Sequence, residues 1–281
     1  MTPMHVVLLV AGVACAFAWS ASLITGDTSW VDRLWSIVPV LYVWVFAVAA
    51  HLSNVRLDTM AALVTIWGIR LTFNFARKGG YSGVEDYRWQ VLRDAMAPWQ
   101  FQIFNLFFIV LYQNLLLVLI SLPAYNAFQY RTTPSGAIEV VLAVAFLLCT
   151  VGETLADQEQ WNFQSWKRRE IEAGRVPSQG FVTSGLFRLS RHPNYFFEIA
   201  QWWVLYFIGA LAAHGPIQWT IVGPVLLSLL FVGSTNFTEK ISKSHYPEYA
   251  LYQRRVSSII PWFARSRINE IQIVDLEQRL D

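Results

Sequence analysis

The chain has 281 residues, of which 55% are hydrophobic, 15% aromatic and only 14% charged, and its mean hydropathy is +0.38. The formal net charge is +2 and no nucleic-acid-binding motif is present, so we expect no nucleic-acid partner. Two cysteines, Cys15 and Cys149, both lie in apolar runs and indicate neither a disulfide framework nor a metal site.

Seven apolar runs of about 20 residues predict membrane-spanning helices. They cover about residues 5–24, 34–52, 59–76, 101–122, 136–156, 195–213 and 217–236. No Lys or Arg precedes the first run, which favours a first span over a cleaved signal peptide. We therefore expect an all-α polytopic membrane protein, with one seven-helix membrane domain over residues 1–262 and a polar cytoplasmic tail over residues 263–281. The loosely helical spacing in the tail predicts a surface helix without chemistry.

The basic residues predict the orientation of these helices. If the N-terminus is outside, 18 of the 21 Lys and Arg residues lie on the inner side, and only Arg56 and Arg131 lie outside. Because cytoplasmic loops carry an excess of basic residues, this asymmetry favours N-out and C-in. The predicted localisation is a bacterial inner membrane, or the endoplasmic reticulum if the source is a eukaryote, with the site in the cytoplasmic half of the bundle.

The first candidate residues lie at the second and third spans. Asp32 precedes the second span, where it is either a helix cap or a proton donor whose pKa burial would raise. Arg70 lies inside the third span and needs a partner or a polar cavity, and Asn74 shares its helix face. The polar loop that follows, residues 76–90, is either a lid over a ligand or a self-paired surface hairpin.

The fourth and fifth spans add amides and acids. Asn105, Gln113 and Asn114 in the fourth span are either packing residues or pocket lining. The fifth span ends with Glu153 and Asp157 on one helix face, and we expect its helix to continue into the cytosol. The cationic patch that follows, residues 167–169, is also what attraction to lipid head groups would produce.

The stretch from Gly185 to Glu198, GLFRLSRHPNYFFE, organises the rest of the chain. Pro193 fits the first turn of a helix, which places cations just before the helix start, where unpaired N–H groups attract anions. A phosphate site is one reading of these cations (Arg188, Arg191 and His192), and ordinary flanking charge at a membrane surface is the other. Asn194 and Glu198 share a helix face. There is no GxGxxG fingerprint, so any nucleotide must bind between helices and loops.

The segment after the last span interleaves acidic, aromatic and basic residues. Tyrosines at a membrane interface are usually anchors. Their concentration beside two arginines favours a second wall of the same site, with the candidates Glu239, His245, Tyr246, Tyr249, Tyr252, Arg254 and Arg255.

Three motifs, TIWGIRL, SRHPNYFFE and TEKISKSHYPEYALYQRRVSSIIPW, occur in this order and together resemble the steroid 5α-reductase family. Many bacterial relatives of that family are known only as a membrane domain of unknown function. The resemblance covers about residues 28–263. The RHPNY core is also similar to isoprenylcysteine carboxyl methyltransferases, but the continuation through Asn194, Tyr195 and Glu198 resembles the reductases.

The resemblance implies NADPH as the cofactor and a hydrophobic enone, such as a 3-oxo-Δ4 steroid, as the substrate that enters from the lipid. It implies that Asn194 and Glu198 hold the nicotinamide amide, that Arg175 and Arg191 contact phosphates, and that Asp157 contacts the adenosine part. Further cations would meet the 2′-phosphate. The remaining residues of the predicted cofactor site are Arg168, Arg169, Arg188, His192, Tyr195, Glu239, Tyr246, Arg254 and Arg255.

The resemblance also implies a pair of residues that polarises the substrate ketone, a Glu on the second span and a Tyr on the third. Asp32 and Trp67 stand at these positions in this chain. Because indole replaces phenol at Trp67, Tyr87 or Tyr42 is an alternative donor. Arg70, Asn74 and Gln113 are the expected pocket residues, and no metal is expected. The alternative functions are an S-adenosylmethionine-dependent methyltransferase and a non-enzymatic lipid-binding protein.

Overall fold

A computed structural model describes residues 1–263, so the surface helix expected in the polar tail lies outside the described residues. The described chain is helical, and its only β-type pairing is an isolated parallel bridge between Ser190 and Ser257. Seven helical runs are long and apolar enough to cross a membrane. The all-α class and the seven spans are therefore confirmed, whereas the N-out orientation stays a prediction.

The seven runs follow the expected segments with shifted ends. They are Pro3–Thr25, Trp30–Ala49, Val55–Arg77, Pro98–Gln129, Ala137–Glu172, Pro193–Ala212 and Trp219–His245. The fifth is the single helix α8, which continues well past the apolar segment, as the sequence predicted. The sixth is α9, and it begins at Pro193, whose missing N–H costs nothing in a first turn.

Two of the runs are interrupted. The second consists of α2 (Trp30–Trp35) and α3 (Val38–Ala49), because Pro39 in the first turn of α3 cannot donate a backbone hydrogen bond to the preceding turn. The fourth consists of α6 (Pro98–Phe104), the π-helical η1 (Asn105–Tyr112) and α7 (Gln113–Gln129). Each run is still one candidate span, as the sequence predicted, but the sequence showed neither the break before α3 nor the π-helical turns.

Local signals explain several helix ends. The N-terminal helix α1 (Pro3–Thr25) begins with a capping box between Thr2 and His5 and ends at Gly26, whose φ of 69° suits glycine. Asn54 caps α4 (Val55–Arg77) by accepting a hydrogen bond from the backbone N–H of Leu57. Asp86 caps α5 (Tyr87–Ala95) in the same way.

The chain divides into two compact units. The first comprises Met1–Thr154 and Phe197–Phe231, and the second comprises Leu155–Phe196 and the C-terminal part from Val232 onward. The expected organisation, a single domain over residues 1–262 followed by a tail, stays a prediction.

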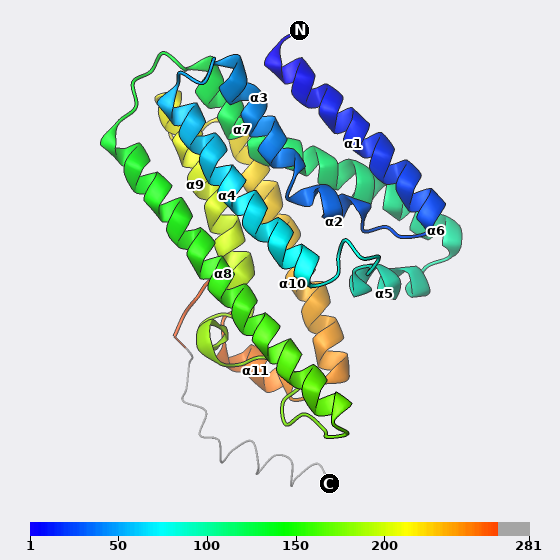
Figure 1. Cartoon of the computed structure of the whole chain (residues 1–281). Coiled ribbons are helices and arrows are strands. Elements are labelled where there is room, and N and C mark those ends of the chain that lie inside the picture. The colour runs from blue at the N-terminus through cyan, green and yellow to red at the C-terminus, as the bar shows by residue number, and fades with distance from the viewer. Residues whose placement is uncertain (264–281) are drawn as a thin grey trace. The chain divides into compact units, whose positions relative to one another are not determined.

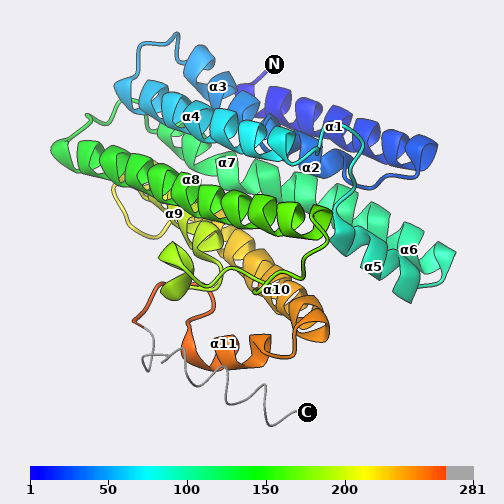
Figure 2. The same ribbon diagram turned by 60° about the horizontal axis from the view of Figure 1, so that its bottom comes forward.

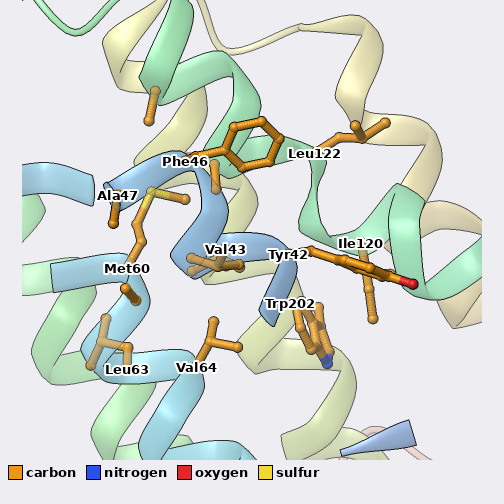
Figure 3. Packing of buried hydrophobic residues seen from close by; sticks show 14 of the residues in the cluster. Tyr42, Val43, Phe46, Ala47, Met60, Leu63, Val64, Ile120, Leu122 and Trp202 are labelled. Carbon is orange, nitrogen blue, oxygen red and sulfur yellow. The ribbon is translucent and has the colours of Figure 1, made fainter. Parts of the chain in front are cut away.

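The first unit has a core between its long helices. Helices α3 and α4 lie side by side, and α1 and α7 both pack against α3 (Figures 1 and 2). Figure 3 shows side chains from four helices in contact there: α3 contributes Tyr42, Val43, Phe46 and Ala47, α4 contributes Met60, Leu63 and Val64, α7 contributes Ile120 and Leu122, and α9 contributes Trp202. This core places Trp67 of α4 and Trp202 of α9 in one cluster, which is where the candidate site lies.

Small residues allow helices of the first unit to approach α7 closely. A Cβ at Gly209 of α9 would collide with the backbone carbonyl of Pro123 in α7. A Cβ at Gly223, which follows η3 (Trp219–Ile221) at the start of α10 (Val222–His245), would collide with the carbonyl of Leu119. Such contacts are typical of membrane helices, whose packing depends on small residues.

The second unit joins two distant segments of the chain. It contains η2 (Gly185–Arg188), the first residues of α9 and α11 (Tyr249–Arg255). The hydroxyl of Tyr252 on α11 donates to the carbonyl of Phe187 at 2.5 Å, and Phe181 stacks on the ring of Tyr252. These contacts attach the C-terminal segment to the loop that precedes α9.

Candidate functional site

The carboxylate of Glu198, on α9, is buried at 4% exposure. Each of its oxygens accepts a hydrogen bond from an indole: Trp67 Nε1 lies 2.7 Å from Oε2, and Trp202 Nε1 lies 3.0 Å from Oε1. The two indole rings also pack edge to face, with centroids 4.9 Å apart. Buried carboxylates need hydrogen bonds, and here both indole donors are uncharged.

Arg70, on α4, brings a positive charge to the same place. Its Nη2 lies 2.5 Å from Oε1 of Glu153 on α8 and 4.0 Å from Oε2 of Glu198. Its side chain is 10% exposed. The sequence predicted that an arginine within this span would need a partner, and Glu153 is that partner.

Gln201 continues the network from Glu153 back to α9. Its Nε2 donates to Oε2 of Glu153 at 2.7 Å and to the carbonyl of Phe197 at 3.1 Å. Its Oε1 accepts from the hydroxyl of Thr150 at 2.7 Å. Gln201 is fully buried, and these bonds fix the orientation of its amide.

Asp32 and Tyr87 do not join the group around Glu198. Asp32 was expected to be catalytic from the resemblance, and Tyr87 was the alternative donor because Trp67 replaces the family's Tyr. Asp32 accepts a hydrogen bond from Trp89 Nε1 at 3.0 Å, whereas Trp67 donates to Glu198. Tyr87 is 53% exposed at the start of α5. Of the three proposed catalytic residues, the structure thus brings only Trp67 to Glu198.

The polar loop after α4 pairs with the loop between α1 and α2. Glu85 accepts two hydrogen bonds of 2.8 Å from Thr28, one from its backbone N–H and one from its hydroxyl, and two from the Arg93 guanidinium, the shorter at 2.6 Å. Burial alone would raise the pKa of Glu85, but these bonds outweigh it, and the pKa lies below the usual 4.5. Arg33 likewise bonds Asp27 and the carbonyl of Gly80. The loop is thus paired with a neighbouring loop and also within itself, where the Arg88 guanidinium binds Asp86 at 2.6 Å.

Tyr42, the second alternative phenol, is fully buried on α3. Its ring lies beside Trp202 and Ile120 in the core (Figure 3). Within residues 1–263 its hydroxyl has no hydrogen-bond partner. A buried hydroxyl without a partner costs stability, so Tyr42 is a candidate for contact with a ligand oxygen.

The other expected pocket residues are buried too. Asn74 is 7% exposed and its Oδ1 accepts from Nε of Arg77 at 2.9 Å. Gln113 is 4% exposed and begins α7, directly after the π-helical turns of η1. Irregular turns of this kind are frequent at functional sites, and their position was not visible in the sequence.

In the second unit, Arg191 and His192 meet Glu239 of α10. The Arg191 guanidinium contacts both carboxylate oxygens, at 2.6 and 3.0 Å, and also donates to the carbonyls of Gln253 and Val256. His192 Nε2 lies 3.1 Å from Glu239, and the Gln253 amide donates to it at 2.8 Å. The phosphate role of Arg191 stays a prediction, and in this structure its guanidinium is committed to a protein carboxylate.

Backbone pairing surrounds this ion pair. The N–H of Arg191 donates to the carbonyl of Ser257 at 2.8 Å, and the N–H of His192 donates to that of Ser258 at 3.1 Å. The Trp262 N–H donates to the carbonyl of Leu189 at 2.9 Å. Through these backbone hydrogen bonds, the RHP motif holds the segment after α11 in place.

The remaining residues predicted to bind the cofactor all lie in the second unit. Asn194 and Tyr195 are half-buried in the first turn of α9, and Tyr195 stacks on His192. Tyr246 contacts Nζ of Lys167 at 2.5 Å. Arg175 pairs with Glu170 at 2.6 Å. Asp157 is buried at 4% exposure, Arg255 is partly exposed, and four arginines are exposed: Arg168, Arg169, Arg188 and Arg254.

An open pocket of about 420 Å³ also lies on the second unit. One side of its wall is formed by α8 and includes Glu159, Phe163 and Trp166. The other side is formed by the loop before η2. Glu159 accepts from the backbone N–H of Leu186 at 2.9 Å, and a side chain at Gly185 would collide with it. No sequence motif pointed to this pocket.

Sequence reasoning did not single out Trp202 or Gln201, which lie four and three residues after Glu198. Residues three and four positions apart are neighbours on a helix surface. This spacing is the sequence signal that could have identified Gln201 and Trp202 as neighbours of Glu198. Glu153 was noted only for the face it shares with Asp157. Its pairing with Arg70 joins residues far apart in the sequence, which local patterns do not predict.

Residues 18–256 match the profile of a family described as "Protein of unknown function (DUF1295)". The chain is 37% identical over 274 residues to the uncharacterized protein C594.04c of Schizosaccharomyces pombe, an alignment that covers 92% of this chain and 80% of the relative. No solved structure matches.

Proposed function

The chain belongs to the DUF1295 family of membrane proteins, which is related to the steroid 5α-reductases, and we propose that it is an NADPH-dependent reductase of a hydrophobic enone. The preferred substrate class is a 3-oxo-Δ4 steroid or a related lipid. The observation that carries the proposal is the buried Glu198 carboxylate, fixed by two indole donors and approached by Arg70.

The acceptor capacity of Glu198 supports a carboxamide ligand. Each carboxylate oxygen has two lone pairs, and the two indoles use one on each oxygen. A primary amide, such as that of nicotinamide, offers two N–H donors that fit the remaining lone pairs. In this proposal Asn194 contributes at the same end of the cofactor, as the resemblance implies.

The phosphates of a nucleotide cofactor require cations, and the resemblance assigns that role to arginines. Considered by itself, the second unit carries exposed Arg168, Arg169, Arg188 and Arg254, whose guanidinium groups suit phosphate oxygens. Arg191 is held by Glu239, so we assign it to the protein scaffold first. Phosphate binding by Arg191 would require it to exchange one anion for another.

Reduction of an enone also needs a group at the ketone oxygen. When bound, NADPH would supply the hydride that goes to the β-carbon. Trp67 already donates its indole N–H to Glu198 and has no second polar hydrogen, so we propose that it positions Glu198. The buried hydroxyl of Tyr42 and the carboxyl of Asp32 are the candidates for polarising the ketone.

The test uses the full-length protein in detergent, with NADPH and either testosterone or progesterone. We expect loss of NADPH absorbance and a product heavier by two hydrogens. Glu198→Gln should lose NADPH binding, because its NH2 group replaces one acceptor oxygen. The matched control is Trp203→Phe, since Trp203 also lies on α9 and its indole donates to Ser228 rather than to Glu198.

Two outcomes would contradict the proposal. Thermal stabilisation by S-adenosylmethionine but not by NADPH would point to a methyltransferase, because specific ligands raise apparent stability. Stabilisation by neither cofactor, together with no product from either steroid, would point to a lipid-binding protein without enzymatic activity.

A further inference from the structure

Four side chains and one backbone carbonyl form a closed circuit around Glu198. Glu198 faces Arg70 at 4.0 Å, Arg70 contacts Glu153 at 2.5 Å, and Glu153 accepts from Gln201 at 2.7 Å. Gln201 then donates to the carbonyl of Phe197, the residue before Glu198. The circuit passes from α9 to α4 and α8 and returns to α9, so each member limits the position of the next.

The two carboxylates do not share the guanidinium equally. Nη2 of Arg70 lies 2.5 Å from Oε1 of Glu153, so these two groups form a close ion pair. The 4.0 Å separation from Glu198 is too long for a hydrogen bond. At this distance Nη2 of Arg70 acts on Glu198 through its charge and does not occupy an acceptor lone pair of Glu198.

We infer that Glu153 and Gln201 are positioning residues that hold Arg70 away from Glu198. Without that restraint the guanidinium can move onto Glu198 and form a two-pronged pair, the geometry that arginine and carboxylate prefer. Such a pair would occupy the lone pairs that a carboxamide needs. This inference rests on the proposed function, because it explains how Glu198 stays open to the nicotinamide amide.

Gln201 orients the carboxylate of Glu153. Thr150 donates to the amide oxygen of Gln201, which forces the amide nitrogen toward Glu153. Glu153 is thereby held on α8 with Oε1 at Arg70 and Oε2 at Gln201. A glutamate at position 201 would instead place a second carboxylate against Glu153.

The experiment measures the dissociation constant of NADPH for three variants of the full chain in detergent. Glu153→Gln should weaken NADPH binding by roughly tenfold or more, although Glu153 is not proposed to touch the cofactor. The double variant Arg70→Gln/Glu153→Gln should regain most of that affinity, because no guanidinium is left to cover Glu198. The matched control is Glu139→Gln, which breaks another buried pair on α8, with Arg56 at 2.6 Å, and should leave affinity unchanged.

Equal losses in the single and double variants would overturn the inference and leave the proposed function standing. A second measurement decides the case without NADPH. In the natural background, the unfolding temperatures of Arg70→Gln, Glu198→Gln and the double variant measure the charge coupling across 4.0 Å. In the Glu153→Gln background this coupling should grow by roughly 2–4 °C, as a closer Arg70–Glu198 pair requires.

If the natural protein binds no NADPH, the reductase proposal fails, and the unfolding cycle alone tests the positioning inference. An equal coupling in both backgrounds would show that Arg70 does not move onto Glu198. That result would overturn the inference whatever the cofactor proves to be.

Discussion

Two buried glutamates, Glu198 in the first unit and Glu239 in the second, have nearly equal exposure, 4% and 5%, and opposite surroundings. Glu239 accepts a two-pronged bond from Arg191, a contact from His192 and a bond from Gln253. Glu198 accepts from two uncharged indoles, and its cation stays at 4.0 Å.

The difference separates a structural joint, the Arg191–Glu239 ion pair, from the proposed binding site at Glu198. A buried charge is tolerable when its partners neutralise it and satisfy its lone pairs, and Glu239 meets both conditions. Glu198 is held in place by hydrogen bonds that leave acceptor capacity for a further donor. Burial alone would have ranked the two residues together, whereas the chemistry of their partners distinguishes them.

The largest expected effect is on the joint. Arg191→Ala should lower the apparent Tm by roughly 10 °C, because removal of one partner of a buried pair leaves an uncompensated charge. Differential scanning fluorimetry in detergent measures this directly. An unchanged Tm combined with lost NADPH binding would instead return Arg191 to the phosphate role.

The next effect is on the binding site. Glu198→Gln should cost roughly 1–3 kcal/mol of stability, because one indole N–H then faces an amide NH2 group. It should also weaken NADPH binding at least tenfold, measured by quenching of tryptophan fluorescence. If NADPH affinity and stability fall only in Glu239 variants, Glu198 is not the binding residue and Glu239 is not purely structural.

A pair of neighbouring tryptophans sharpens the contrast. Trp202→Phe removes a donor to Glu198, whereas Trp203→Phe removes a donor to Ser228. Trp202 is 1% exposed and donates to a carboxylate, whereas Trp203 is half-buried and donates to a hydroxyl, so Trp202→Phe should cost more stability. Only Trp202→Phe should change the affinity for NADPH, and equal affinity in the two variants would count against the role of Glu198.

A smaller effect is expected at Tyr42. Because its hydroxyl is buried without a partner in the described structure, Tyr42→Phe should raise stability by about 1 kcal/mol. Loss of turnover in the same variant, with NADPH affinity retained, would assign the phenol to the substrate ketone. Retained turnover would leave Asp32 as the candidate.

The smallest effect concerns the pH dependence of a loop. The pKa of Glu85 is lowered in the folded protein, so the unfolded chain takes up its proton at a higher pH. The stabilisation from Glu85 is therefore complete above the usual pKa of 4.5 and is lost as the pH falls through the folded value. Glu85→Gln should flatten the acid side of a Tm profile, and a profile identical to that of the natural protein would reject this origin.

The sequence predicted what local chemistry controls. Seven apolar runs, the helix start at Pro193 and the need of Arg70 for a partner all follow from composition, proline geometry and the cost of charge in a membrane. The partners themselves could not be predicted, because Trp67 and Glu198 are 131 positions apart and Arg191 and Glu239 are 48 apart. Pairings of that range depend on how helices pack, which local periodicity does not encode.

The pairing of Arg70 with Glu153 also has a consequence for biogenesis. Glu153 lies 83 positions after Arg70, so a ribosome that adds about 5–20 residues per second needs about 4–17 s to reach it. During that interval α4 carries its arginine without its acid partner, at a cost of about 2.5–3.5 kcal/mol for insertion at a helix centre. Stable insertion of α4 is therefore expected to wait for α8, and a chain stopped before Glu153 should leave α4 poorly inserted.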